Sequence, residues 1–139
     1  MLRCQSGAGF TTIDLACLDR AAGTLTLYKY GAAPSYIKRH GTVARCTAAT
    51  LPAGLESADG DVPPQTVPAS PGTWLVQVSD GVAGEDDEWL QDLLAGWDGR
   101  SPRALAEELL RQSAQRTGGA DDCAVSVLAV EGREEPHRV

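Results

Sequence analysis

An uncharged run, Thr73–Ser79, ends at an aspartate, Asp80, that is followed by glycine. The run predicts a strand buried on both faces, because it is largely apolar and bounded by a turn signal. A carboxylate at the mouth of a rigid strand is well placed to bind a hard cation through oxygen. A second acidic pair, Asp121 and Asp122, opens the last apolar run, Cys123–Val130. With helical patterns between them, the two strand-end positions predict a metal site built from separated strands.

The length, 139 residues, suits one domain or a piece of one, and the hydrophobic fraction of 42% is ordinary for a globular chain. Twelve Lys and Arg against 19 Asp and Glu give a net charge of -7, with no concentrated basic cluster. Nucleic acid is therefore excluded as a partner, because neutralising phosphates needs a basic footprint. An acidic protein can still bind a phosphorylated substrate if a cation supplies positive charge.

Neither a signal peptide nor an apolar run of membrane-spanning length is present. We therefore expect a cytoplasmic segment without membrane contact; an anchor elsewhere in a full-length protein stays open. The cysteines are widely spaced and form no Cys-x-x-Cys motif. This pattern favours buried free thiols in a reducing compartment over a zinc site or a disulfide framework. The four residues are Cys4, Cys17, Cys46 and Cys123.

Alternating patterns in the first half predict one hairpin, and a turn signal at His40 and Gly41 predicts a second, so an antiparallel meander is expected. Ile13, Leu15 and Cys17 share one face of the first strand. Lys29 shares a face with the leucines of the second strand, so that face is expected to reach solvent. The predicted strands are Phe10–Leu18, Thr24–Tyr30, Ser35–Arg39 and Thr42–Thr47.

The second half combines an irregular crossing, Pro52–Pro71, with strand and helix signals. A short strand is expected at Gln65–Val67. The acidic run Glu85–Glu88 indicates the N-terminus of a helix and not a metal cluster. A second helix is capped by Ser101, followed by proline, and ends at a glycine pair. The expected apolar stripes of these helices are Trp89, Leu90, Leu93 and Leu94, and Leu105, Leu109 and Leu110. We expect a domain over residues 1–130 and a polar tail over 131–139.

The Asp-Gly dipeptide alone is a weak signal. At Asp59 and Asp98 it predicts ordinary turns, because one lies in the crossing and one joins the two helices. Asp121 and Asp122 alone would favour a solvated entry to a strand. It is their combination with Asp80, at the end of a strand buried on both faces, that favours a metal site.

Several segments, in the same order, resemble the C-terminal part of the phosphatase domain of the stage II sporulation protein E family. That family belongs to the metal-dependent, type 2C-like Ser/Thr phosphatases, and the resemblance covers Leu2–Val130. The segment Gly31–Arg39 is typical of this branch. The segments that carry the resemblance are Thr12–Ala16, Tyr30–Arg39, Leu51–Leu55, Val78–Val82 and Asp121–Val125.

The resemblance implies an α+β fold, part of a four-layer α-β-β-α sandwich of antiparallel sheets with its N-terminal portion missing. It implies Mn²⁺ or Mg²⁺ at one end between the sheets, bound by Asp80 and Asp121, with Asp122 a weaker candidate. No catalytic residue beyond these metal ligands is implied. A metal-activated water would attack phosphorus in line. The implied substrate is phosphoserine on an anti-sigma-factor antagonist protein, which places the chain in sporulation and sigma-factor regulation.

This sequence lacks the early Asp-Gly motif whose aspartate bridges the two ions in the family. We therefore expect a truncated phosphatase domain, a hydrolase by resemblance, without normal turnover in this form. Unpaired strand edges predict self-association, with the uncharged Trp74–Val78 strand as the main liability. The alternative is a non-catalytic interaction module or pseudo-phosphatase remnant in sigma-factor signalling. A calcium-binding β domain is disfavoured, because it would need more closely spaced oxygen ligands than Asp80 and Asp121.

Overall fold

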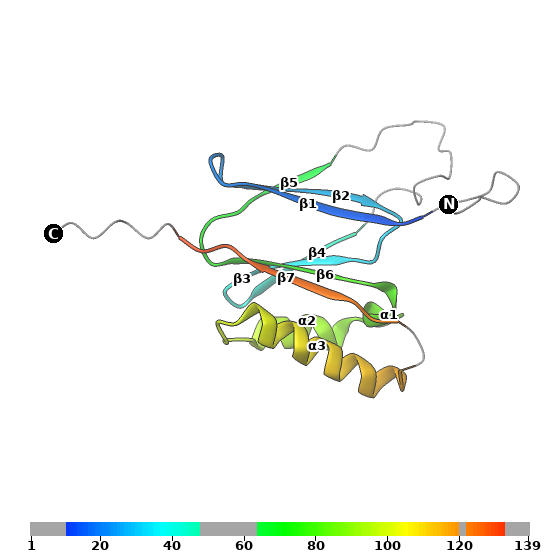
Figure 1. The fold of residues 1–139 in the computed structure, drawn as a ribbon. Helices are drawn as coiled ribbons and strands as arrows, with labels where there is room; N and C mark the ends of the chain where they lie inside the picture. The colour runs from blue at the N-terminus through cyan, green and yellow to red at the C-terminus, as the bar shows by residue number, and fades with distance from the viewer. Residues whose placement is uncertain (1–10, 48–63, 120–121, 133–139) are drawn as a thin grey trace, which may run out of the picture.

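A computed structural model describes residues 11–47, 64–119 and 122–132 (Figure 1). All of its strand pairs are antiparallel, which confirms the expected α+β class. The elements in chain order are β1 (Ile13–Asp19), β2 (Thr24–Tyr30), β3 (Ser35–Arg39), β4 (Thr42–Cys46), β5 (Gln65–Pro68), β6 (Thr73–Val78), α1 (Asp80–Ala83), α2 (Glu88–Gly96), α3 (Pro102–Thr117) and β7 (Val125–Ala129).

The strands form two sheets, one in the order β1-β2-β5 and the other in the order β4-β3-β6-β7. Figure 1 shows the sheets packed face to face, with α1, α2 and α3 along the outer face of the four-stranded sheet. Both predicted hairpins are confirmed. The prediction of a single meander is wrong, because β2 does not pair with β3. Gly31, at φ 64°, instead bends the chain so that β3 enters the second sheet.

The core has two parts that meet at β6. Leu75 packs between the sheets with Leu25, Leu27 and Ile37. Val76, on the opposite face of β6, packs against the helices. The prediction of a strand buried on both faces is therefore confirmed. Because β6 is paired with β3 on one side and β7 on the other, the expectation that Trp74–Val78 is an exposed association strand is wrong.

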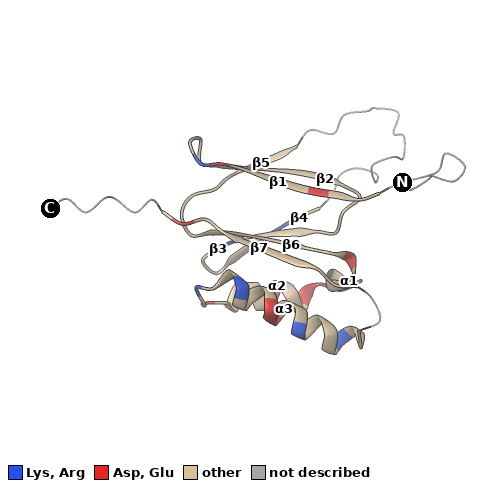
Figure 2. Cartoon of the chain, viewed as in Figure 1, with Lys and Arg blue, Asp and Glu red and all other residues tan. Residues whose placement is uncertain are grey.

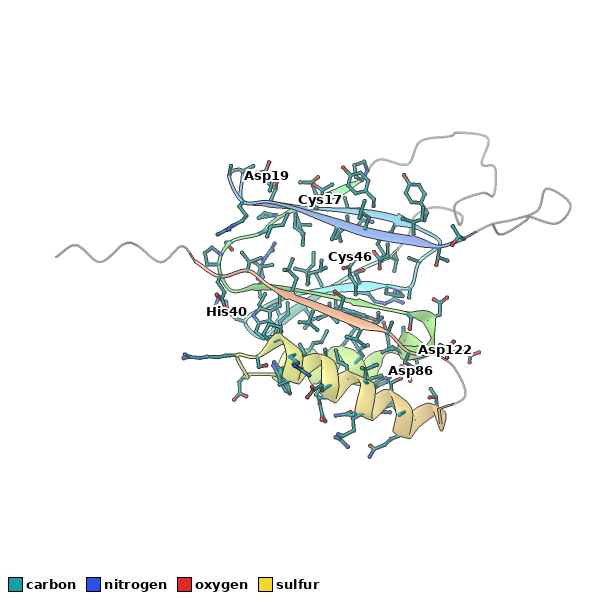
Figure 3. The ribbon with its side chains drawn as sticks, in the orientation of Figure 1. Cys17, Asp19, His40, Cys46, Asp86 and Asp122 are labelled. Atoms are coloured by element: carbon teal, nitrogen blue, oxygen red, sulfur yellow. The ribbon has the colours of Figure 1, made fainter. Side chains whose placement is uncertain are left out.

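The first strand presents two of its large apolar side chains outward. Ile13 and Leu15 are 40% and 52% exposed, and Cys17 is exposed beside them. The predicted shared face is thus present, but no described element covers it. The prediction of a buried thiol is wrong for Cys17 and confirmed for Cys46, which lies between the sheets (Figure 3). Cys123 is half-buried, and Cys4 lies outside the described residues.

Lys29 lies on the inward face of β2 and does not reach solvent. It is 6% exposed, although it shares a face with Leu25 and Leu27 as predicted. The expectation that this face opens to solvent is wrong because partners meet the charge inside: Lys29 Nζ lies 2.9 Å from Asp14 Oδ2 and 2.7 Å from Ser35 Oγ. A buried ammonium is tolerated when it is paired and hydrogen-bonded in this way.

The helix signals of the sequence are confirmed by the geometry of the termini. Ser101 Oγ accepts a hydrogen bond of 3.1 Å from the backbone N–H of Ala104, and Gly118 ends α3 in the left-handed conformation. Leu105 and Leu109 are fully buried, whereas Leu110 is 37% exposed and drops out of the predicted stripe. Many of the charged residues lie on the helices and at element ends, and most of the strand ribbon carries uncharged residues (Figure 2).

Some expectations lie wholly or partly outside the described residues. These include Asp59, much of the Pro52–Pro71 crossing and most of the tail. The short strand in that crossing is present as β5 and extends one residue beyond the prediction, to Pro68. Among the described helices, none is long and apolar enough to cross a membrane.

Candidate metal centre

Strand β6 ends at Val78, one residue earlier than predicted, so Asp80 does not directly follow the strand. It is instead the first residue of the short helix α1. The helix forms because the backbone N–H of Gly84 bonds to the Asp80 carbonyl at 2.9 Å and Val82 anchors the turn in the core. The expected glycine turn is therefore displaced: Gly81 is helical and buried, and the chain turns at Gly84, at φ 60°.

The Asp80 carboxylate is exposed and has no hydrogen bond or ion pair within the described parts of the chain. Asp14 and Asp87 differ from Asp80, because both accept several hydrogen bonds. An uncommitted carboxylate on a short, core-anchored helix is available to a hard cation. Within residues 11–47, 64–119 and 122–132, no three His, Cys, Asp or Glu side chains are grouped so that they could hold a metal ion.

Hydrogen bonds at Ser79 hold the segment before β7 against the start of α1. Ser79 N–H donates to the Ala124 carbonyl at 2.9 Å, and Ala124 N–H donates to Ser79 Oγ, also at 2.9 Å. The Ser79 hydroxyl also lies 3.4 Å from the Asp122 carbonyl. Figure 3 shows Asp122 beside α1. Asp121 lies outside the described residues, so its approach to Asp80 stays a prediction.

A polar quartet between the sheets lies at the same end of the sandwich and was missed from the sequence. Asp14 Oδ2 accepts from Lys29 Nζ at 2.9 Å and from Ser35 Oγ at 3.2 Å. Asp14 Oδ1 accepts from Gln77 Nε2 at 3.1 Å. The available signal was opposite charge at the inward positions of two paired strands, since Asp14 and Lys29 are direct partners in the register.

A second polar cluster joins α2 to the sheet through Asp87. Its Oδ2 accepts from Tyr36 Oη at 2.5 Å and from Arg45 Nε at 2.7 Å, and its Oδ1 accepts from Gln91 Nε2 at 3.1 Å. Burial raises the pKa of Asp87, but the hydrogen bonds outweigh it and hold the pKa below its usual value. Burial, with the Asp87 charge, raises the pKa of Tyr36. This carboxylate is occupied by three side-chain donors.

The acidic run before α2 contributes to a surface cavity instead. This cavity, of about 560 Å³, lies among α1, α2 and α3 and includes Glu85 and Asp86 in its lining. The Arg116 guanidinium lies over the Trp89 ring there, 4.8 Å from its centroid. The prediction that Glu85–Glu88 begins a helix is close, since α2 starts at Glu88.

Comparison with known proteins places the whole described fold in one family. Residues 1–131 match the family Stage II sporulation protein E (SpoIIE). Stage II sporulation protein E of Bacillus subtilis (strain 168) is 26% identical over 130 residues, which are 88% of this chain and 16% of that protein. The Priestia megaterium protein of the same name is 27% identical over 131 residues, or 22% of its length. The chain therefore spans only a small part of these relatives.

Solved structures of phosphatases also superpose on this chain. The phosphatase domain of the cell fate determinant SpoIIE from Bacillus subtilis, presoaked with Mn, superposes with a TM-score of 0.75 at 26% identity. The match covers 90% of this chain and 58% of that domain structure. The serine/threonine phosphatase PstP/Ppp of Mycobacterium tuberculosis, at 19% identity and a TM-score of 0.67, shares the fold; the match covers 88% of this chain and 61% of that structure. The described sheets and helices thus correspond to part of a PP2C-type phosphatase fold.

Proposed function

Because the chain belongs to the stage II sporulation protein E family, we propose that it supplies part of the metal centre of a protein serine/threonine phosphatase. The ligands it contributes are Asp80 and Asp121, with Asp122 a weaker candidate. The ion is Mn²⁺ or Mg²⁺, because carboxylate oxygens suit these hard cations.

The observation that carries this proposal is the state of Asp80. Its carboxylate is exposed and uncommitted on a core-anchored turn, and Ser79 ties that turn to the segment containing Asp122. Two oxygen-donor positions from distant parts of the chain thus face the same end of the sandwich. The donor chemistry therefore fits a hard divalent cation.

In the proposed reaction, Asp80 holds its cation at a fixed position, and the Ser79 bonds keep the Asp122 segment from moving away. The bound ion supplies an activated water and offsets the charge of the phosphate oxygens. The positive charge of the ion matters here, because a chain with a net charge of -7 repels a phosphorylated substrate. Beyond the metal ligands we assign no catalytic residue.

The support for a substrate class is membership of the family. We propose phosphoserine on an anti-sigma-factor antagonist, which places the reaction in sigma-factor regulation. A dephosphorylation assay on such a phosphoprotein, with the chain joined to the rest of its domain, tests it: release of phosphate from other phosphoproteins at an equal rate would contradict the specificity.

The isolated chain is expected to be a poor catalyst. Its match extends over 58% of the solved phosphatase domain, and the ligands proposed for it are Asp80 and Asp121, with Asp122 a weaker candidate. Too few ligands then remain to hold two ions against their mutual repulsion. The N-terminal portion of the four-layer sandwich would have to supply the rest. The competing proposal, a non-catalytic interaction module, predicts no specific cation binding at all.

Cation binding separates these proposals. Mn²⁺ broadens the NMR signals of nearby nuclei even when it binds weakly, so an isotope-labelled chain can be titrated with it. We expect broadening centred on Gly81 and Ala124, lost in Asp80→Asn. Asp98→Asn is the matched control, because Asp98 is an exposed aspartate of a different Asp-Gly pair.

Equal broadening in Asp80→Asn and the unaltered chain would remove Asp80 from the site. Hydrolysis of p-nitrophenyl phosphate is measured in parallel with and without Mn²⁺, and we expect little turnover. Robust Mn²⁺-dependent turnover, lost in Asp80→Asn, would uphold the phosphatase and overturn the expectation of an incomplete centre.

A further inference from the structure

The contact between the two sheets is apolar along most of its length and ionic at one end. Leu25, Leu27, Ile37 and Leu75 pack between the sheets. At the end that leads into α1, the pattern changes to the quartet of Asp14, Lys29, Ser35 and Gln77. The Lys29 side chain is only 2% exposed and the Asp14 side chain 17%.

The quartet joins four strands just before the candidate metal ligand. Asp14 and Lys29 are register partners on β1 and β2, and Ser35 and Gln77 are register partners on β3 and β6. Gln77 precedes Asp80 by only two intervening residues, Val78 and Ser79. The Asp14 carboxylate therefore accepts hydrogen bonds from both sheets, close to the end of β6 that leads to Asp80.

A buried ion pair is weak evidence of a stabilising role. Replacing a buried ion pair by well-packed apolar residues is commonly neutral or stabilising, because the desolvation of both charges offsets their attraction. The neighbouring leucines show that apolar packing between these sheets is available. What directional bonds add is a defined separation and register, which dispersion contacts specify less sharply.

We infer that Asp14 and Lys29 are positioning residues for Asp80: through Ser35 and Gln77 they hold the end of β6 at a defined place between the sheets. This inference rests on the proposed metal function of Asp80. It assigns the quartet to cation affinity and not to the stability of the fold.

The test is the double variant Asp14→Leu/Lys29→Met, which removes both charges together and leaves no unpaired ion. We expect its unfolding midpoint to match or exceed that of the unaltered chain. We expect the Mn²⁺ concentration for half-maximal broadening at Gly81 to rise by about tenfold or more, as for other residues that orient metal ligands. Leu25→Ala is the matched control, because Leu25 is fully buried between the same sheets at the opposite end. It should lower the unfolding midpoint and leave the Mn²⁺ concentration unchanged.

A metal-free measurement decides the inference independently. Amide hydrogen exchange at Ser79 and Ala124 reports the bonds that hold the end of β6. In the double variant we expect faster exchange there and unchanged exchange at Leu27 of the neighbouring sheet. Unchanged exchange at Ser79 and Ala124, or unchanged Mn²⁺ affinity with destabilisation, would overturn the positioning role. If the unaltered chain binds no Mn²⁺, the proposed function fails, and the exchange result alone settles whether the quartet positions β6.

Discussion

The two sheets differ in what covers them. The β4-β3-β6-β7 sheet packs the other sheet on one face and the helices on the other, and its central Val76 is fully buried. The β1-β2-β5 sheet also packs on the other sheet with its inner face, but no described helix lies on its outer face (Figure 1). Leu15 is consequently 52% exposed.

Strands at the edge of a sheet are also less covered than central strands. Leu128 of β7 is the register partner of Leu75, yet it is 38% exposed while Leu75 is 2% exposed. In the part of the chain described, the three-stranded sheet has no strand beyond β1 that would cover this position. An apolar residue is therefore buried here only where a second layer extends over it, whatever its own hydrophobicity.

The largest effect is expected in the covered sheet. Leu105 of α3 is fully buried against that sheet, so Leu105→Ala should lower the free energy of unfolding by about 2–5 kcal/mol. Urea denaturation followed by tryptophan fluorescence measures it. Leu110→Ala, on the same helix at 37% exposure, is the control. Equal losses would mean that α3 does not pack on the sheet as described.

Asp87→Asn should remove about 1.5–3 kcal/mol, because it weakens charged hydrogen bonds from Tyr36 and Arg45 that hold α2 on the sheet. The pKa of Asp87 is lowered in the fold. Its contribution is therefore present above the unfolded-state pKa of about 4 and is lost as pH falls through the lower folded value. Denaturation across that acid range should show a steeper loss in the unaltered chain than in Asp87→Asn. Asp92→Asn, at an exposed position of α2, should behave like the unaltered chain.

Ser101→Ala should cost about 1 kcal/mol, because Ser101 Oγ caps the first turn of α3. The same denaturation experiment measures it. Ser70→Ala provides the comparison, since Ser70 is exposed in a loop and its side chain has no hydrogen bond among the described residues. A loss in Ser70→Ala as large as in Ser101→Ala would show that the cap is not the cause.

The smallest change in stability, within about 0.5 kcal/mol, is expected for Leu15→Lys on the uncovered sheet. Its effect should appear in association instead, because the exposed face of β1 is an apolar contact surface. Size-exclusion chromatography with light scattering should show self-association of the unaltered chain that Leu15→Lys reduces. Leu110→Lys adds the same charge to the helical layer and should not. A sharp monomer peak for the unaltered chain would contradict the prediction of self-association.

Local patterns in the sequence determined the elements and their ends. Alternation predicted β2 with its observed bounds, Thr24–Tyr30, and the turn signal at His40 and Gly41 predicted β3 with its observed bounds, Ser35–Arg39. Both signals are local properties of the chain. Ser101 and Gly118 marked the ends of α3, since a cap depends on backbone groups within one turn. Asp80 was singled out for the same reason, as the residue that follows a buried strand.

Only the tertiary structure decided which partners those elements meet. It sent β3 to the second sheet, left the Leu15 face bare, and enclosed Lys29 with Asp14 and Ser35. It also drew the Asp87 carboxylate to Tyr36, far away in the sequence. Whether a face is buried, and which groups pair, depends on layers that distant parts of the chain contribute. A pattern within one strand therefore specifies two faces without saying which one will be covered.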